Sequence, residues 1–210
     1  MIHPHTEVRF IDEEIGHGVV ATRSIPKGTV TWVRDRLDRE FTSAEVTSFD
    51  DAHREVVERY SYRNATGHYV FCWDHTRFMN HSFDPTCLPT PFGLEIAIRD
   101  IEAGEELTND YGTLNIIEPF KPRREEGSGG RDTVRPDDLL RYAPVWDAAI
   151  ADAFSRFSEV AQPLAKWINA SIRGELELIA KGERSLPSIG ELLFSGETAT
   201  GDGIAEPVRD

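Results

Sequence analysis

Short apolar runs alternate with glycine-containing turns near the start of the chain, and this alternation limits the folds open to it. The runs cover residues 8–11, 18–21 and 29–33, with turn residues at 16–18 and 26–28. Runs of four or five apolar or β-branched residues bounded by Gly and Pro are typical of short strands joined by tight turns. We therefore expect a mainly β fold with added helices.

Helical spacing appears in two other parts of the chain. Residues 42–60 predict one helix, because Thr42 and Glu45 have the spacing of a capping box and apolar residues follow at helical intervals. Strand-like pieces return at 68–73 and 94–98, and residues 121–135 read as a loop or linker. Two further helices are expected within residues 137–183, the second ending near Gly182, and residues 184–210 are expected to form a largely irregular tail.

Composition excludes several functional classes. The net charge of −14 repels phosphate backbones and argues against a nucleic-acid substrate. The same charge would attract a basic peptide, or it only keeps the protein soluble. No stretch reads as a membrane span or a secretory signal, and two cysteines are too few for a disulfide framework, so a cytoplasmic protein is expected.

Three separated segments carry glycines and polar residues that need a joint explanation. They are Gly16-His17-Gly18, residues 77–86 around Asn80-His81-Ser82, and residues 94–112, which end in Asp110-Tyr111-Gly112. Glycines let a backbone approach a ligand closely, and an Asn amide offers both donors and acceptors. Taken singly, the three segments are explained equally well as a tight turn, a polar turn and a β-hairpin with a packed tyrosine.

In this order and at these distances, the three segments resemble the signatures of the SET domain of protein-lysine methyltransferases. The resemblance covers about residues 7–115. It implies a SET-type fold of several small sheets, in which the Asn-His-Ser and Asp-Tyr-Gly segments thread through one another as a pseudoknot. Residues 116–136 would then replace the post-SET segment of the family, followed by the C-terminal helical region at 137–183 and the tail at 184–210.

The resemblance also implies roles for particular residues. Gly16, His17 and Gly18 would contact the methionine part of S-adenosylmethionine, Asn80 would bind its ammonium, and His81 its adenine. Tyr111 would line the methyl-transfer channel as the catalytic residue and also touch the cofactor. The reaction needs no metal.

Departures from the family pattern leave some properties open. Phe83 stands where many relatives have a zinc-binding Cys, and residues 121–134 contain no cysteine, so no post-SET zinc is expected. Thr86 replaces a usual Asn, and Asn109 replaces the Phe or Tyr that tends to set how many methyl groups are added. The aromatic residues Trp146, Phe154, Phe157 and Trp167 either wall the lysine channel in place of the zinc segment or only hold the C-terminal helices to the domain.

The predicted function is transfer of a methyl group to lysine side chains of a protein substrate, with a basic lysine-containing segment favoured by the charge. Two alternatives stay open. One is an inactive SET scaffold that binds a protein partner, and the other is a methyltransferase of a small amine. Neither a nucleic-acid nor a membrane partner is expected, and the sequence does not predict the oligomeric state.

Overall fold

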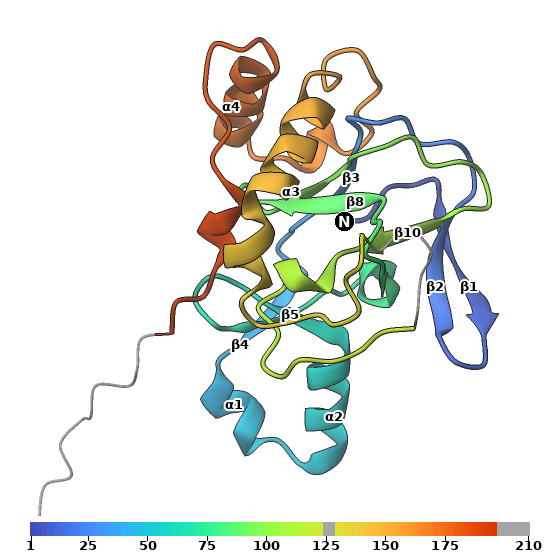
Figure 1. Ribbon diagram of the computed structural model, residues 1–210, viewed down its shortest axis with the longest axis vertical. Coiled ribbons are helices and arrows are strands. Elements are labelled where there is room, and N and C mark those ends of the chain that lie inside the picture. Colours follow the sequence, from blue (N-terminus) through green and yellow to red (C-terminus); the bar gives the residue numbers. More distant parts are fainter. Residues whose placement is uncertain (124–128, 197–210) are drawn as a thin grey trace, which may run out of the picture.

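A computed structural model describes residues 1–123 and 129–196 of the chain (Figure 1). Three small sheets form the body of the protein, with strand orders β1-β2-β10-β7, β3-β9-β8 and β4-β6-β5. The strands are β1 (Thr6–Asp12), β2 (Gly16–Ala21), β3 (Val30–Val33), β4 (Arg39–Phe41), β5 (Ser61–Arg63), β6 (Tyr69–Phe71), β7 (Asn80–His81), β8 (Cys87–Thr90), β9 (Leu94–Ala97) and β10 (Glu106–Asn109). Several small sheets with C-terminal helices are the architecture that the sequence predicted.

Helices lie at two ends of this body (Figure 1). Within the described residues, two short α-helices precede β5, two longer ones follow the sheets, and four 3₁₀ turns connect the strands and helices. They are α1 (Ser43–Ser48), α2 (Asp51–Tyr60), α3 (Asp138–Phe154) and α4 (Ala170–Ala180), with η1 (His75–Phe78), η2 (Tyr111–Thr113), η3 (Ala165–Trp167) and η4 (Ile189–Leu192).

Two local predictions need correction. The single helix expected over residues 42–60 is two helices, because Phe49 adopts an extended conformation and Asp50 caps α2 by accepting from His53 N. The capping box of Thr42 and Glu45 is present as predicted. Gly16 and Gly18 do not form a turn; they belong to β2, which pairs antiparallel with β1.

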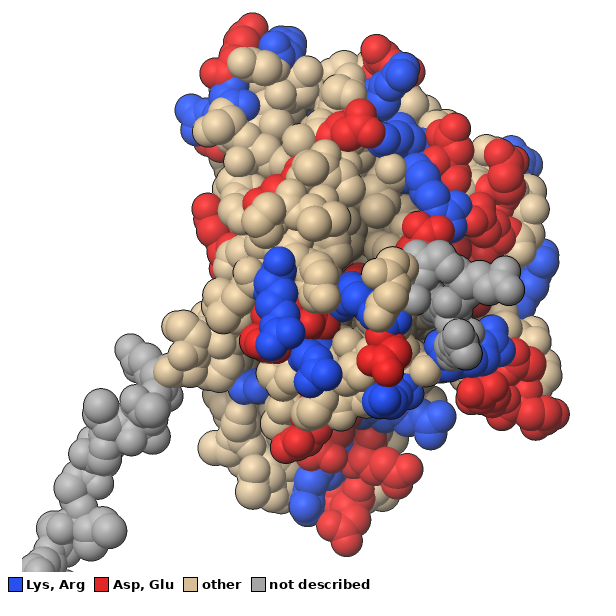
Figure 2. Space-filling view, viewed as in Figure 1, with Lys and Arg blue, Asp and Glu red and all other residues tan. Residues whose placement is uncertain are grey.

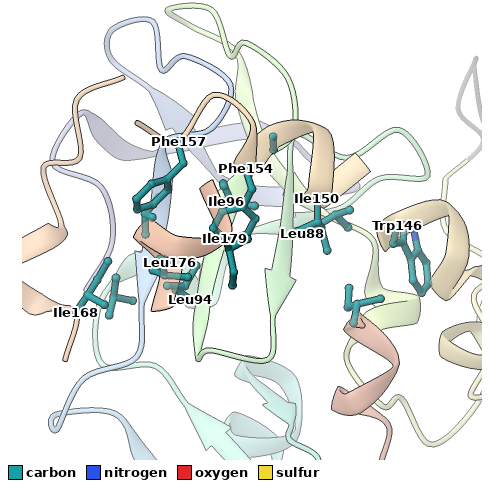
Figure 3. Close-up of a cluster of buried hydrophobic side chains, with 14 of the residues drawn as sticks. Leu88, Leu94, Ile96, Trp146, Ile150, Phe154, Phe157, Ile168, Leu176 and Ile179 are labelled. Carbon is teal, nitrogen blue, oxygen red and sulfur yellow. The ribbon is translucent and has the colours of Figure 1, made fainter. Parts of the chain in front are cut away.

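The C-terminal helices are packed against the sheet β3-β9-β8 through one hydrophobic cluster (Figure 3). Leu88, Leu94 and Ile96 from the sheet belong to this cluster together with α3 and α4 residues such as Phe154 and Leu176. Burying several large side chains in one cluster contributes roughly 1.5–3 kcal/mol each, so these helices are part of the folded body. The structure describes the two ends of the predicted loop at 121–135, but residues 124–128 lie outside the described residues. It also describes the first part of the predicted tail at 184–210, but residues 197–210 lie outside the described residues.

A parallel strand pair joins two of the sequence segments singled out above. β7 pairs with β10 in parallel, with Asn80 opposite Thr108 and His81 opposite Asn109. The segments around Asn80 and Tyr111 therefore run side by side, although about 30 residues separate them. Their threading into a pseudoknot remains a prediction.

Charges of both signs are spread over the face in Figure 2, and acidic side chains gather at the tip of the β1–β2 hairpin and beside α2.

Phe120 and Val134 pair on either side of residues 121–133, and their backbone groups exchange hydrogen bonds of 3.1 and 2.9 Å. Among residues 1–123 and 129–196, none of the helices is long and apolar enough to cross a membrane.

Candidate active site

The sheet β1-β2-β10-β7 brings together the residues that the sequence assigned to cofactor binding. The side chain of Asn80 donates through Nδ2 to the carbonyl oxygen of His17, at 3.0 Å, and to Glu106 Oε1, at 2.6 Å. Both hydrogens of this amide are thus held by the chain, so Asn80 can offer a ligand only its Oδ1 acceptor. An acceptor next to a carboxylate suits a cationic ligand such as an ammonium or a sulfonium.

A side chain at position 18 would displace that hydrogen-bonded pair. A Cβ at residue 18 would overlap Glu106 Oε1, and it would lie 2.8 Å from Glu106 Cδ and 2.9 Å from Asn80 Nδ2. Gly16 differs, since its φ of +81° favours glycine while a Cβ would meet no atom within 4 Å. The two glycines of the motif therefore have separate reasons to be glycine.

Tyr111 is held from both its backbone and its hydroxyl. Its N–H donates to His81 Nδ1 at 3.1 Å, and its hydroxyl donates to the carbonyl oxygen of Met79 at 2.7 Å. Burial, followed by the charges of Glu106 and Glu95, raises the pKa of Tyr111 to about 12. The hydroxyl is therefore neutral near pH 7, and its oxygen keeps lone pairs that can accept a hydrogen bond.

Aromatic rings cover this part of the site. Phe120 lies 6.0 Å from the His81 ring and 6.2 Å from the Tyr111 ring, centre to centre, and Phe83 lies 4.5 Å from His81. Backbone hydrogen bonds with Val134 hold Phe120, whose ring lies beside that of Tyr111. Sequence reasoning assigned no role to Phe120.

Two adjoining cavities meet at this site. The inner one measures about 390 Å³ and is lined by Tyr111, Met79, Asn109 and Phe120 among others. The outer one is a groove of about 1100 Å³ that reaches the exposed side chains of Leu37, Trp73 and Trp167. Residues that line both are Trp32, Tyr62, Arg63, Glu95 and Leu114.

The predicted site residues are not all on the same surface. Among the six, Tyr111 lines the inner cavity, while Gly16, His17, Gly18, Asn80 and His81 form the strand cluster beside it. The link between cluster and cavity runs through the contacts of Tyr111 with His81 and Met79.

Glu95 lines both cavities, and the sequence reasoning assigned it no role. It is 6% exposed on β9, and its Oε1 accepts from Asn109 Nδ2 at 2.8 Å. Burial raises the pKa of Glu95 to about 7. The available signal was a single charge inside the apolar run Leu94–Ala97, all four residues of which are buried.

An arginine lies beside Phe83, the position at which the resemblance implies a zinc-binding cysteine in many relatives. Arg131 binds both Asp110, the residue before Tyr111, and Asp138 at the start of α3, with 2.7 Å from Nη2 to Asp138 Oδ2. Its guanidinium also lies over the rings of Phe83 and Tyr142, at 4.5 and 4.2 Å from their centres. Cys72 and Cys87 are both free and buried, and the described residues hold no group of three metal-ligating side chains.

The four C-terminal aromatic residues separate into two groups. Trp146, Phe154 and Phe157 are buried in the cluster that holds the helices to the sheet. Trp167 is 46% exposed and lines the outer groove. Trp146, Phe154 and Phe157 therefore hold the C-terminal helices to the sheet, and Trp167 forms part of the wall of the outer groove.

A family comparison agrees with this geometry. The family model of the SET domain matches residues 16–112, which include all six residues assigned to the site. The chain has no significant match among curated proteins. The SET family consists of lysine methyltransferases that depend on S-adenosylmethionine. With the matched segment, the three small sheets and no cysteine cluster for a post-SET zinc, this chain carries a SET domain over residues 16–112.

Proposed function

We propose that the protein transfers methyl groups from S-adenosylmethionine to lysine side chains of a protein substrate. The observation that carries this proposal is the junction of the two cavities. The inner cavity contains Tyr111, and it shares a wall with an outer groove of about 1100 Å³, large enough for a polypeptide segment. A small amine would not need such a groove, so a protein substrate is favoured.

The residues present fit the cofactor. The strand cluster provides the Asn80 Oδ1 acceptor and the Glu106 carboxylate beside it, and both side chains lie against Gly18. Gly16, His17, Gly18, Asn80, His81 and Tyr111 would hold the cofactor, whose ammonium and sulfonium are both cationic. When bound, it supplies a methyl group that is already activated for transfer to a nucleophile.

The protein's own task is then to align a neutral amine. The ammonium of a lysine in water has a pKa of about 10.4, so burial beside a positive sulfonium favours its loss of a proton. The hydroxyl of Tyr111 points its hydrogen at Met79 O, and its oxygen is left to accept an N–H of the amine. Phe120 covers Tyr111 and His81 and limits the access of water.

The charge of the whole protein and the charge of the outer groove favour different substrates. The net charge of −14 would attract a basic lysine-containing segment as it approaches. The outer groove itself contains four cationic side chains, Arg34, Arg36, Arg63 and Lys166, against the carboxylates of Asp35 and Glu95. The groove therefore does not favour positive charge in the substrate residues that bind inside it. The attraction by the net charge then applies to the approach of the substrate, not to the residues in the groove.

A methyl-transfer assay tests the proposal. Radiolabelled S-adenosylmethionine is incubated with the protein and an array of lysine-containing peptides, each matched by the same peptide with arginine in place of lysine. Label on lysine peptides alone supports the proposal. Label on small amines alone would support a small-amine methyltransferase instead. No label on any acceptor, while the cofactor binds in calorimetry, would support a binding scaffold.

A further inference from the structure

The inner cavity is lined by an unusual set of buried polar atoms. Five side-chain atoms of residues that line it are buried without a hydrogen-bond partner in the described part of the chain: Trp32 Nε1, Ser61 Oγ, Thr76 Oγ1, Glu95 Oε2 and Asn109 Oδ1. Buried polar atoms are normally hydrogen-bonded, so several orphans around one cavity point to a polar ligand.

Glu95 is the charged member of this set. Asn109 is 4% exposed and occupies Glu95 Oε1, which leaves Oε2 of the carboxylate and Oδ1 of the amide as acceptors. Three arginines line the cavity, and each is engaged elsewhere. Arg59 lies over the ring of Tyr60 at 5.5 Å. Arg77 donates to the carbonyl oxygen of Trp73 at 2.7 Å, and Arg63 lies over the ring of Phe194 at 4.9 Å.

The electrostatic surroundings of Glu95 are set by few groups. Desolvation is the main cause of its raised pKa, the hydrogen bond from Asn109 opposes it, and the charge of Asp74 adds to it. The amino group of Met1 acts in the opposite direction. Tyr62, Cys72, Cys87 and Tyr111 also interact with Glu95. Burial is the largest cause that raises the pKa of each of these four groups, so they stay neutral.

A buried carboxylate without a cation is costly, and a cationic ligand offsets that cost. A primary ammonium has three N–H donors, and the site offers Glu95 Oε2, Asn109 Oδ1 and the Tyr111 hydroxyl oxygen as acceptors. Glu95 lines the groove as well as the inner cavity.

We propose that Glu95, oriented by Asn109, binds the ammonium of the incoming substrate lysine and takes its proton. This inference rests on the proposed function. One N–H bond of the ammonium breaks and its electron pair stays on the nitrogen, while the proton forms an O–H bond with Glu95 Oε2. The resulting neutral amine is the nucleophile, and the protonated Glu95 later loses the proton to solvent.

The pKa values are compatible with this transfer. The pKa of Glu95, about 7, lies within about three to four units of that of a lysine in water, whereas an ordinary glutamate would be about six units away. Proton transfer is most efficient when the acceptor pKa lies close to the working pH. Affinity for an ammonium should accordingly rise as the pH passes through about 7 and Glu95 becomes charged.

The test uses n-butylammonium chloride, which mimics the end of a lysine side chain, followed by NMR titration. Glu95→Gln keeps the shape and removes the charge, and we expect it to weaken n-butylammonium binding about 10- to 100-fold at pH 8 and to abolish the rise in affinity between about pH 6 and 8. Glu58→Gln is the matched control, because Glu58 is exposed and lines the same cavity, and it should weaken binding by no more than about twofold. S-adenosylhomocysteine affinity, measured in parallel, should be unchanged in both variants and reports an intact fold.

The outcomes separate the two proposals. Equal n-butylammonium affinity in wild type and Glu95→Gln, or no binding to the wild type, would overturn the ammonium site even if methyl transfer occurs. Charge-dependent binding at Glu95 without methyl transfer by the wild type would support the ammonium site and overturn the methyltransferase. If both the ammonium site and the methyltransferase are correct, kcat of Glu95→Gln should fall. The pH profile of kcat for this variant should also lose the rise near pH 7.

Discussion

The guanidinium carbon of Arg131 lies 4.5 Å from the ring centre of Phe83, the residue that stands where SET relatives carry a zinc-binding cysteine. The same guanidinium joins Asp110, which precedes Tyr111, to Asp138, where α3 begins. One cation thus connects the residue before Tyr111 to the first residue of α3.

Arg131→Leu should be strongly destabilising. The side chains of Asp110 and Asp138 are 0% and 1% exposed, so removing their shared cation leaves two carboxylates buried without compensation. Breaking buried ion pairs in this way costs about 3–5 kcal/mol, which urea unfolding would measure. The control is Arg141→Leu, whose partner Asp137 is solvent-exposed, and this change should be nearly silent. Equal stability of the two variants would show that Arg131 is not a central anchor.

Glu95→Gln should raise stability at alkaline pH. The folded-state pKa of about 7 lies above the value of 4.5 that is usual for a solvated glutamate, so the folded protein binds more protons than the unfolded chain between these pH values. The stability that this difference contributes is complete below pH 4.5 and is lost as the pH rises through 7. At about 1.4 kcal/mol for each pH unit between 4.5 and 7, the contribution is roughly 3 kcal/mol.

The measurement is urea unfolding of wild type and Glu95→Gln at about pH 4.5 and pH 8. We expect similar stability at the lower pH and a more stable variant at the higher one. A variant that is less stable than wild type at the higher pH would mean that the carboxylate is compensated by a cation in the folded protein.

Gly18→Ala should impair cofactor binding without strain in the backbone. The new Cβ would overlap Glu106 and displace it from Asn80, and Asn80 would then lose its orientation. Loss of a hydrogen bond to a charged group corresponds to about a 10- to 100-fold loss of affinity for S-adenosylhomocysteine in calorimetry. Gly174→Ala on α4, where a Cβ meets no atom within 4 Å, should leave that affinity unchanged. Unaltered binding by Gly18→Ala would remove β2 from the cofactor site.

Turnover of a basic peptide should fall as salt is raised, because attraction by the net charge is screened within about 8 Å at physiological ionic strength. Arg36→Ala and Lys166→Ala remove cations from the groove. Each should raise kcat/KM for peptides with basic flanks by about two- to fivefold and leave peptides with neutral flanks unchanged. If both variants lower kcat/KM for basic flanks, the groove does not bind the substrate in the way proposed.

Local patterns predicted much of the fold, and tertiary contacts explain what they missed. Thr42 and Glu45 predicted a helix start correctly because a capping box involves only neighbouring residues. The break at Phe49 was hidden because the apolar spacing continues through it, although Asp50 offered a cap signal. The sheet and helix architecture followed from the motif resemblance together with the apolar stripe of α3.

The site was predicted in part for the same reason. Asn80, His81 and Tyr111 belong to recognisable motifs, and their contacts are present. The pairing of Glu95 with Asn109 depends on how β9 and β10 face each other, which a sequence does not encode locally. Arg131 and Asp110 are 21 residues apart, and no spacing rule predicts their contact.

The measurement that decides most directly is the single-turnover rate of methyl transfer for wild type and Tyr111→Phe, at saturating S-adenosylmethionine and with a lysine peptide identified by the array. The variant keeps the ring beside His81 and Phe120 and loses only the hydroxyl that donates to Met79 O. We predict a rate loss of about 10- to 1000-fold with little change in cofactor affinity, equivalent to roughly 1.4–4 kcal/mol of transition-state stabilisation. Equal rates in two folded, active proteins would contradict a catalytic role for Tyr111, and no transfer by the wild type would contradict the methyltransferase itself.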